Sequence, residues 1–223
     1  MEESKKPLQN FFNNFFKVAA QSRTYANIFY LLLAFPLGIF YFIFFVTGFS
    51  LGVGLVPIFI GLPLIMFMFY ISKYFMAFER TLARQFLGTE IPPSDMTEAP
   101  ANGFWKRFKA QVFDLKAWKS LIFLIIKFPA GIFSFVVVVT LLSISLALIS
   151  APITYSAIIQ SINIDIFQYD IFYYLAPDYF SSFEKSLIYM VVGFFLTFIF
   201  LHVINLVAYI SGKLVAFMSL EWN

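Results

Sequence analysis

Four stretches of the chain are apolar almost without interruption, at about 28–49, 53–72, 121–144 and 187–210. A helix rises about 1.5 Å per residue, so roughly 20 residues cross the ~30 Å hydrocarbon core of a bilayer. Each stretch therefore predicts a transmembrane helix. The composition agrees, since the 223 residues are 61% hydrophobic and 12% charged, whereas soluble domains are about half apolar and about a quarter charged. The pattern predicts an all-α integral membrane protein.

A tight reversal is predicted between the first two stretches. Residues 48–54 contain three glycines, and Pro57 follows them. Glycine adopts the backbone conformations that tight turns need, and proline interrupts helices. A single bent helix over both stretches would be about twice as long as the bilayer is thick. We therefore expect a helical hairpin that turns at residues 48–54.

The basic residues predict the orientation of the spans. Residues 1–26 carry four lysines and arginines, residues 73–119 carry eight and the C-terminal tail carries one. The turn at 48–54 carries none, and the connection at 160–185 carries only Lys185. Because positively charged segments stay on the cytoplasmic side, we expect a multi-pass protein of the cell membrane with both termini in the cytoplasm.

Two parts of the chain repeat each other. The sequence FPLGIFYF at 35–42 returns 93 positions later as FPAGIFSF at 128–135. Further on, YIS at 70–72 and AF at 77–78 return after 139 positions. The difference between the two offsets is an insertion of 46 residues in the second copy. We therefore predict two membrane units of the same orientation, a parallel repeat.

The predicted units and the linker between them have the following bounds. The first unit covers residues 1–90, a cytoplasmic linker covers 91–103, and the second unit covers 104–223. Each unit is expected to begin with a short helix, at 8–20 and at 104–118, whose apolar residues recur at helical spacing. Amphipathic helices of this kind lie in the membrane interface with their aromatic side chains towards the lipid.

Most of the insertion is a predicted external segment, residues 160–185. Ile162, Ile164 and Ile166 alternate with polar residues, a period of two that is typical of a strand. Acidic and aromatic side chains follow, and the candidates for sensing a signal are Asp165, Tyr169, Asp170, Tyr173, Tyr174 and Asp178. One interpretation is an aromatic belt at the outer interface. Others are a pocket or partner surface for a cation or cationic peptide, or a dimerisation surface.

Several polar residues lie within or beside the apolar stretches. His202 and Asn205 are one helical turn apart in the fourth stretch, where we expect hydrogen bonds between helices, with pH sensing as the alternative for the histidine. Lys127 is expected to extend to the cytoplasmic headgroups. Arg80 and Arg84 share one helix face and are expected to be solvated or near lipid phosphates.

The repeated motifs each contain a proline and a glycine: Pro36 with Gly38, and Pro129 with Gly131. Proline kinks a helix, and glycine permits close contact between helices. We interpret these residues as architectural, with a role as hinges for a signal as the alternative.

Catalytic chemistry finds no support in the sequence. The chain has no cysteine, which excludes disulfides and thiolate sites. It lacks a glycine-rich nucleotide loop, a metal-ligand cluster and a hydrolase elbow. We therefore expect no enzyme, no cofactor, no metal site and no nucleic-acid partner. The first twenty residues have no apolar core with a cleavage site, so no removable signal peptide is expected.

The order of motifs resembles a known family. Residues 30–42, 48–52, 78–80 and 87–88 resemble the putative sensor domain of prokaryotic two-component histidine kinases, and the resemblance covers about residues 22–220. In that family a four-span membrane domain precedes a cytoplasmic kinase. The 223 residues contain no kinase domain, so the resemblance implies either a stand-alone sensor module or a part of a longer protein, and the module is expected to pass its signal to a separate partner.

The leading hypothesis is a non-enzymatic sensor or regulatory module that detects an external or bilayer signal. Its expected partners are the lipid bilayer and a protein, either a histidine kinase, a regulator or a transport complex, and a homodimer is possible. The alternatives are a small-solute transporter or channel, and an accessory subunit of a larger membrane complex.

Overall fold

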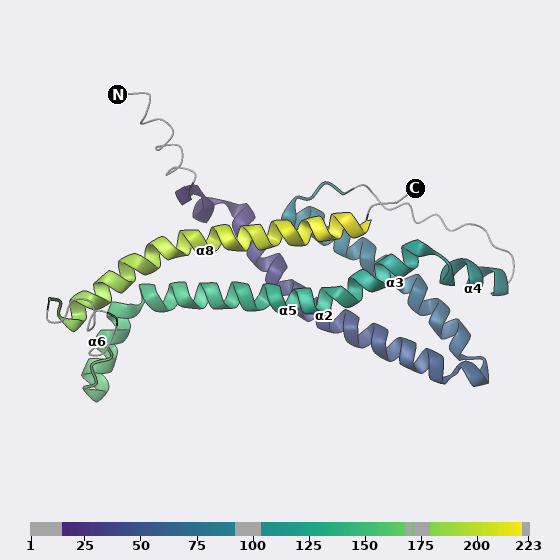
Figure 1. The fold of residues 1–223 in the computed structure, drawn as a ribbon, viewed down its shortest axis with the longest axis horizontal. Coiled ribbons are helices and arrows are strands. Elements are labelled where there is room, and N and C mark those ends of the chain that lie inside the picture. The colour runs from purple at the N-terminus through teal and green to yellow at the C-terminus, as the bar shows by residue number, and fades with distance from the viewer. Residues whose placement is uncertain (1–14, 92–103, 168–170, 172–178, 220–223) are drawn as a thin grey trace, which may run out of the picture. The chain divides into compact units, whose positions relative to one another are not determined.

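The computed structural model describes residues 15–91, 104–167, 171 and 179–219, and these residues are mostly helical (Figure 1). No strand occurs among them, which confirms the all-α prediction. Residues 15–20 are helical. The following elements, in chain order, are α2 (Ser22–Gly54), the 3-10 helix η1 (Val56–Ile58), α3 (Gly61–Leu87), α4 (Phe104–Val112), α5 (Leu115–Ile149), α6 (Ala151–Ile162) and α8 (Ser182–Ser219).

Four of these helices, α2, α3, α5 and α8, are long and apolar enough to cross a membrane. They correspond to the four apolar stretches, so the prediction of a multi-pass membrane protein is confirmed. Each helix extends beyond its stretch. The helix α3, for example, continues from the apolar part at its start to Leu87, where Gly88 ends it in the left-handed conformation (φ 59°).

The reversal between α2 and α3 lies later than predicted. The helix α2 continues through the glycines to Gly54, and the chain reverses at 55–60 through η1, with Phe59 in the left-handed conformation (φ 62°). A Cβ atom on Gly48 would meet the Met68 side chain, and one on Gly52 would meet Ile65. The glycines therefore let α3 pack closely on α2, and the turn prediction was wrong because it assigned them to the loop.

The chain divides into two compact bodies. The large body comprises residues 22–136 and 204–223, and the small body comprises residues 1–21 and 137–203. The helices α5 and α8 each begin in one body and end in the other. The large body therefore holds α2, α3, α4, the first part of α5 and the last part of α8.

Within the large body, the two repeated motifs meet where α2 and α5 contact each other. A Cβ atom on Gly38 would lie 2.8 Å from the carbonyl oxygen of Lys127, and one on Gly131 would lie 2.4 Å from that of Ala34. The two main chains are therefore in contact at both glycines. The aromatic rings pair in the same reciprocal way: Phe35 stacks on Phe135 and Phe42 on Phe128, each pair with ring centroids 4.7 Å apart.

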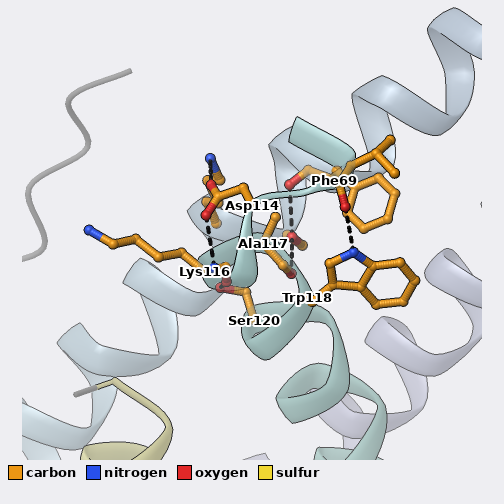
Figure 2. Close-up of polar contacts among 9 residues, drawn as sticks. Phe69, Asp114, Lys116, Ala117, Trp118 and Ser120 are labelled. Carbon is orange, nitrogen blue, oxygen red and sulfur yellow. Dashed lines mark hydrogen bonds and ion pairs between the residues drawn. The ribbon is translucent and has the colours of Figure 1, made fainter. Parts of the chain in front are cut away.

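The short helix predicted at 104–118 is split in two. The helix α4 ends at Val112, and Asp114 begins α5 by accepting a hydrogen bond from the main-chain nitrogen of Lys116, at 2.9 Å (Figure 2). Aspartate is a preferred residue at helix N-termini because it satisfies main-chain donors there. The indole of Trp118 donates to the carbonyl of Val112 at 2.7 Å across the break.

The start of α5 is also bound to α3. Lys73 pairs with Asp114 at 2.7 Å, and the hydroxyl of Ser72 lies 3.5 Å from the carbonyl oxygen of Ala117 (Figure 2). The same hydroxyl donates to the carbonyl of Phe69 at 2.8 Å. These contacts connect α3 to the beginning of α5.

In the small body, the alternation of Ile162, Ile164 and Ile166 does not form a strand. Ile162 is the last residue of α6, and Asn163 ends that helix in the left-handed conformation (φ 52°). The helical pattern of 151–162 extends across the first of the alternating residues, so the short period-two signal was misleading. Ser181 precedes the next long helix, α8, and forms a capping box with Glu184: the main-chain nitrogen of Ser181 donates to the Glu184 carboxylate at 2.8 Å, and the main-chain nitrogen of Glu184 donates to the Ser181 hydroxyl at 3.4 Å.

Candidate functional site

A pair of opposite charges lies buried in the large body. The ammonium of Lys127 on α5 donates to the carboxylate of Glu79 on α3 at 2.7 Å, and their side chains are 6% and 0% exposed. The same ammonium donates to the hydroxyl of Tyr30 on α2 at 2.8 Å. Three of the four candidate spans thus meet at one amine.

The helical register of α3 explains why Glu79 is buried. Its buried residues include Ser72, Met76, Glu79 and Ala83, at spacings of three and four that place them on one face of the helix. This face packs within the protein, and Glu79 lies on it in phase with its apolar neighbours. The carboxylate is therefore held inside because the helix continues, and Lys127 provides its counter-charge.

Tyr41 completes the cluster. It lies three helical turns after Tyr30 on the same face of α2 and is 1% exposed. Its hydroxyl lies close to the Glu79 carboxyl, and the described residues offer this hydroxyl no other hydrogen-bond partner. The four side chains Tyr30, Tyr41, Glu79 and Lys127 are called the buried charge cluster below.

The energetics of the buried charge cluster depend on its being complete. Moving one ion out of water costs several kcal/mol, which the attraction of a well-placed partner roughly offsets. Removing one partner leaves the other charge buried and costs about 3–5 kcal/mol. The cluster is therefore expected to add little net stability, while loss of one member alone is expected to destabilise the packing of α2, α3 and α5.

Lys127 was predicted to reach the headgroups, and this prediction was wrong. The side chain is instead nearly fully buried and paired. The prediction followed from the position of the lysine at the edge of an apolar stretch, where snorkelling is the usual solution. It missed Glu79 because that residue lies beyond the second apolar stretch, although its register with Ser72 and Met76 is a signal that the sequence contains.

Three arginines of the large body donate hydrogen bonds to main-chain carbonyls. Arg80 donates to the carbonyl of Ser219 at 3.0 Å, at the end of α8, and Arg23 donates to the carbonyl of Leu87 at 2.7 Å, at the end of α3. Arg84 donates to the carbonyl of Ile91. The last carbonyls of a helix lack partners within it and carry partial negative charge. Arg80 and Arg23 satisfy such carbonyls, whereas the exposed Arg84 binds a carbonyl beyond the end of α3. None of these contacts was predicted.

The predicted pair of His202 and Asn205 has separate contacts. Asn205 donates to the hydroxyl of Thr24 at 3.1 Å and accepts from the amide of Asn27 at 2.9 Å, which joins α8 to α2. In the small body, the exposed ring of His202 stacks on Phe15 with centroids 5.5 Å apart. Among the described residues, no three histidine, cysteine or acidic side chains gather as a metal site would require.

Of the candidates in the predicted external segment, the structure describes Asp165. Its carboxylate accepts a hydrogen bond from the Ser182 hydroxyl at 2.5 Å and from the main-chain nitrogen of Phe167 at 3.0 Å. Asp165 thereby holds residues 165–167 against the start of α8. The other candidates lie outside the described residues: Tyr169, Asp170, Tyr173, Tyr174 and Asp178.

A model of one protein family matches residues 30–218 of the chain, and its description is "Putative sensor". The chain belongs to the putative sensor family. The resemblance found in the motifs is thereby confirmed, and the matched region contains the whole buried charge cluster. Neither a curated protein nor a solved structure matches the chain.

Proposed function

We propose that the protein is a non-enzymatic membrane sensor that passes a signal to a separate protein partner. Membership of the putative sensor family supports the sensory role. The single observation that carries the mechanism is the buried pair of Glu79 and Lys127. This pair is the element whose state a signal would change.

The pair is absent from the matching positions of the repeat. At the offset of 93, Lys127 corresponds to Ala34, and at the offset of 139, Glu79 corresponds to Met218. The charges therefore belong to a place where the two sequence copies differ. In a medium of low dielectric constant, paired and separated charges differ strongly in free energy, so helices joined by such a pair have distinct arrangements and few intermediates. A signal acts on such an element by favouring one arrangement.

The output is expected at the end of α3. This helix continues from Glu79 to Leu87, where Arg23 and Arg84 bind the carbonyls of Leu87 and Ile91. In the proposed topology both termini and the linker at 91–103 are cytoplasmic, with the short helices at 8–20 and 104–118 in the interface. A change in the helix packing at Glu79 thus reaches the side where a kinase, a regulator or a transport complex would bind.

The input is expected from the bilayer or from the external segment at 160–185. In that segment Asp165, Tyr169, Asp170, Tyr173, Tyr174 and Asp178 remain the candidates for contact with an external signal. A small-solute transporter or an accessory subunit is the alternative function. Asn27 bonds to Asn205, and Glu79 bonds to Lys127. These polar residues of the spans thus pair between helices, which favours a helix-packing role over a polar pathway.

The proposal predicts that breaking the charge pair changes the helix arrangement. Because the chain has no cysteine, spin labels attach only at introduced cysteines. Phe78 on α3 and Phe217 on α8 are 47% and 55% exposed and both lie in the large body. In nanodiscs of phosphatidylcholine, the distance distribution between labels at these positions is expected to shift in Glu79→Gln. The double exchange Glu79→Lys with Lys127→Glu, which keeps a pair, is expected to restore it.

The same variants provide the test of output. In cells that carry them on the chromosome, Glu79→Gln is expected to change the transcripts that also change when the gene is deleted, and the double exchange is expected to leave them normal. Immunoblots control for protein level. Unchanged distances together with unchanged transcripts, at normal protein level, would contradict the proposal.

A further inference from the structure

A cavity lies beside Lys127 in the large body. It holds about 250 Å³ of empty space, its open mouth included. Within it, the space that is enclosed tightly enough to exclude bulk solvent is about the size of one water molecule. The walls come from α2, α5 and α8, and the lining residues are Ala34, Phe123, Lys127, Ala130, Gly131, Ser134, Ser211, Leu214 and Val215.

Most residues of the cavity wall that differ between the two sequence copies are smaller in the second copy; the exception is Lys127, which corresponds to Ala34. At the offset of 93, Ser134 corresponds to Tyr41 and Ala130 to Leu37. At the offset of 139, two more lining residues are smaller than their counterparts, since Leu214 corresponds to Phe75 and Val215 to Met76. The largest loss is at Ser134, where a hydroxymethyl group replaces a phenol.

The corresponding place in the first copy contains bulky, buried side chains. Tyr41 and Met76 are 1% and 2% exposed, and the ring of Tyr41 lies 5.3 Å from that of Phe75. The reciprocal contacts of Gly38 and Gly131 support the comparison, because each glycine touches the main chain at the other copy's corresponding residues. The first copy thus has an aromatic ring, that of Tyr41, at the place where the second copy has Ser134.

The polar groups at the cavity suit a hydroxyl. An ammonium has three N–H donors. The ammonium of Lys127 donates to Glu79 and to Tyr30. Ser134 donates to the carbonyl of Ala130 at 2.8 Å, which leaves the lone pairs of its own oxygen to accept a hydrogen bond. The remaining walls are largely apolar, as the site for an aromatic ring requires.

We infer that this cavity binds a small phenol, a single aromatic ring with a hydroxyl group, that enters from the bilayer. The hydroxyl occupies the enclosed space near Lys127 and Ser134, and the ring occupies the mouth. Binding itself does not depend on the proposed sensory function; only the role of the bound phenol as a signal rests on it. Because Lys127 belongs both to the cavity wall and to the buried charge cluster, occupancy acts directly on the charge pair.

The test measures binding of 4-fluorophenol to the purified full chain in phosphatidylcholine nanodiscs by fluorine NMR. A saturable bound signal is expected above the partitioning seen in empty nanodiscs. Ser134→Tyr introduces the residue that fills this place in the first copy, and it is expected to abolish saturable binding. Ser143→Tyr is the matched control on the same helix, where the side chain is exposed, and it is expected to bind as the wild type does.

Two further measurements make the result specific. Ala130→Leu, also taken from the first copy, is expected to abolish binding and replaces Ser134→Tyr if that variant does not fold. Fluorobenzene lacks the hydroxyl and is expected to bind roughly threefold to tenfold more weakly, the usual contribution of one hydrogen bond. Equal binding to wild type and both cavity variants, or no saturable signal from the wild type, would overturn the inference.

Binding and signalling can fail separately. Saturable binding without any change in the transcripts affected by Glu79→Gln would support the cavity and remove phenol as the signal. Transcripts that respond to Glu79→Gln, with no binding to the wild type, would support the sensor and overturn the cavity.

Discussion

At the scale of single residues, Glu79 and Lys127 show how a membrane protein can bury charged side chains between its helices. Each of the two would be costly there by itself, and together they are bound at 2.7 Å with Tyr30 as a third partner. A second ion pair of the large body, Lys73 with Asp114, has the same 2.7 Å separation but is about one quarter exposed. The two pairs thus have the same distance between charges and differ in burial.

This difference predicts different effects of removing each lysine. Lys127→Met leaves the Glu79 carboxylate buried without its partner, and it is expected to lower the free energy of unfolding by about 3–5 kcal/mol. Lys73→Met breaks a partly solvated pair and is expected to cost less than about 1 kcal/mol. Unfolding of both variants in the same detergent, followed by circular dichroism, measures the difference. Equal losses would show that burial of the pair has no energetic role.

The partner of Lys127 could not be predicted from local sequence. The lysine is visible as a charge beside an apolar stretch, but its contact with Glu79 arises from the way α3 and α5 pack, 48 residues apart in the chain. Asn205 is a similar case, because its partners Thr24 and Asn27 lie 181 and 178 residues away. The sequence identifies these polar residues as unusual, and the packing determines which of them meet.

At the scale of elements, the contact of α2 with α5 depends on two glycines. Added Cβ atoms would overlap main-chain atoms at Gly38 and Gly131, where neither helix has a flexible side chain to displace. In a bilayer, helices associate through close packing because lipid provides no hydrophobic driving force between them. Small residues at this contact are therefore a requirement of the fold.

Replacing one of these glycines is expected to separate the helices. Gly131→Ala places a Cβ atom 2.4 Å from the Ala34 carbonyl oxygen, and we expect it to lower the free energy of unfolding by about 1–3 kcal/mol, as overpacking does. Gly54→Ala is the control, since nothing lies within 4 Å of its added Cβ, and its effect is expected to stay within about 1 kcal/mol. Thermal unfolding in detergent compares the two. Equal stability of both variants would contradict close contact at Gly131.

The elements themselves were predictable where hydropathy alone identifies them. The four spans follow from apolar length alone, and the all-helical fold follows with them. Their ends were not predictable in the same way. Glycines such as Gly48 and Gly52 are typical of a turn, yet they lie within α2 and pack against Met68 and Ile65 of α3. The polar stretch after Ser72 likewise continues as helix to Leu87. In both places tertiary packing overrides local preference.

At the scale of the whole molecule, the orientation proposed from the distribution of basic residues can be measured. Trp105 on α4 and Tyr179 are 59% and 82% exposed, and the proposed topology places them on opposite sides. In the cysteine-free chain, Tyr179→Cys is expected to react with a membrane-impermeant maleimide in intact cells. Trp105→Cys is expected to react only after the cells are permeabilised. Labelling of Trp105→Cys in intact cells would reverse the topology.

The reciprocal contact of Gly38 and Gly131 also bears on how such a protein changes by mutation. In a symmetric dimer of identical subunits, one residue touches a second and that second touches the first, and every mutation appears on both sides of the interface. Here both sides are encoded in one gene, so each can mutate alone. Ala34 can stay alanine while its counterpart is Lys127, and Tyr41 can stay tyrosine while its counterpart is Ser134. Joining the two copies in one reading frame thus allows a single lysine and a single cavity, where a dimer would be obliged to carry two of each.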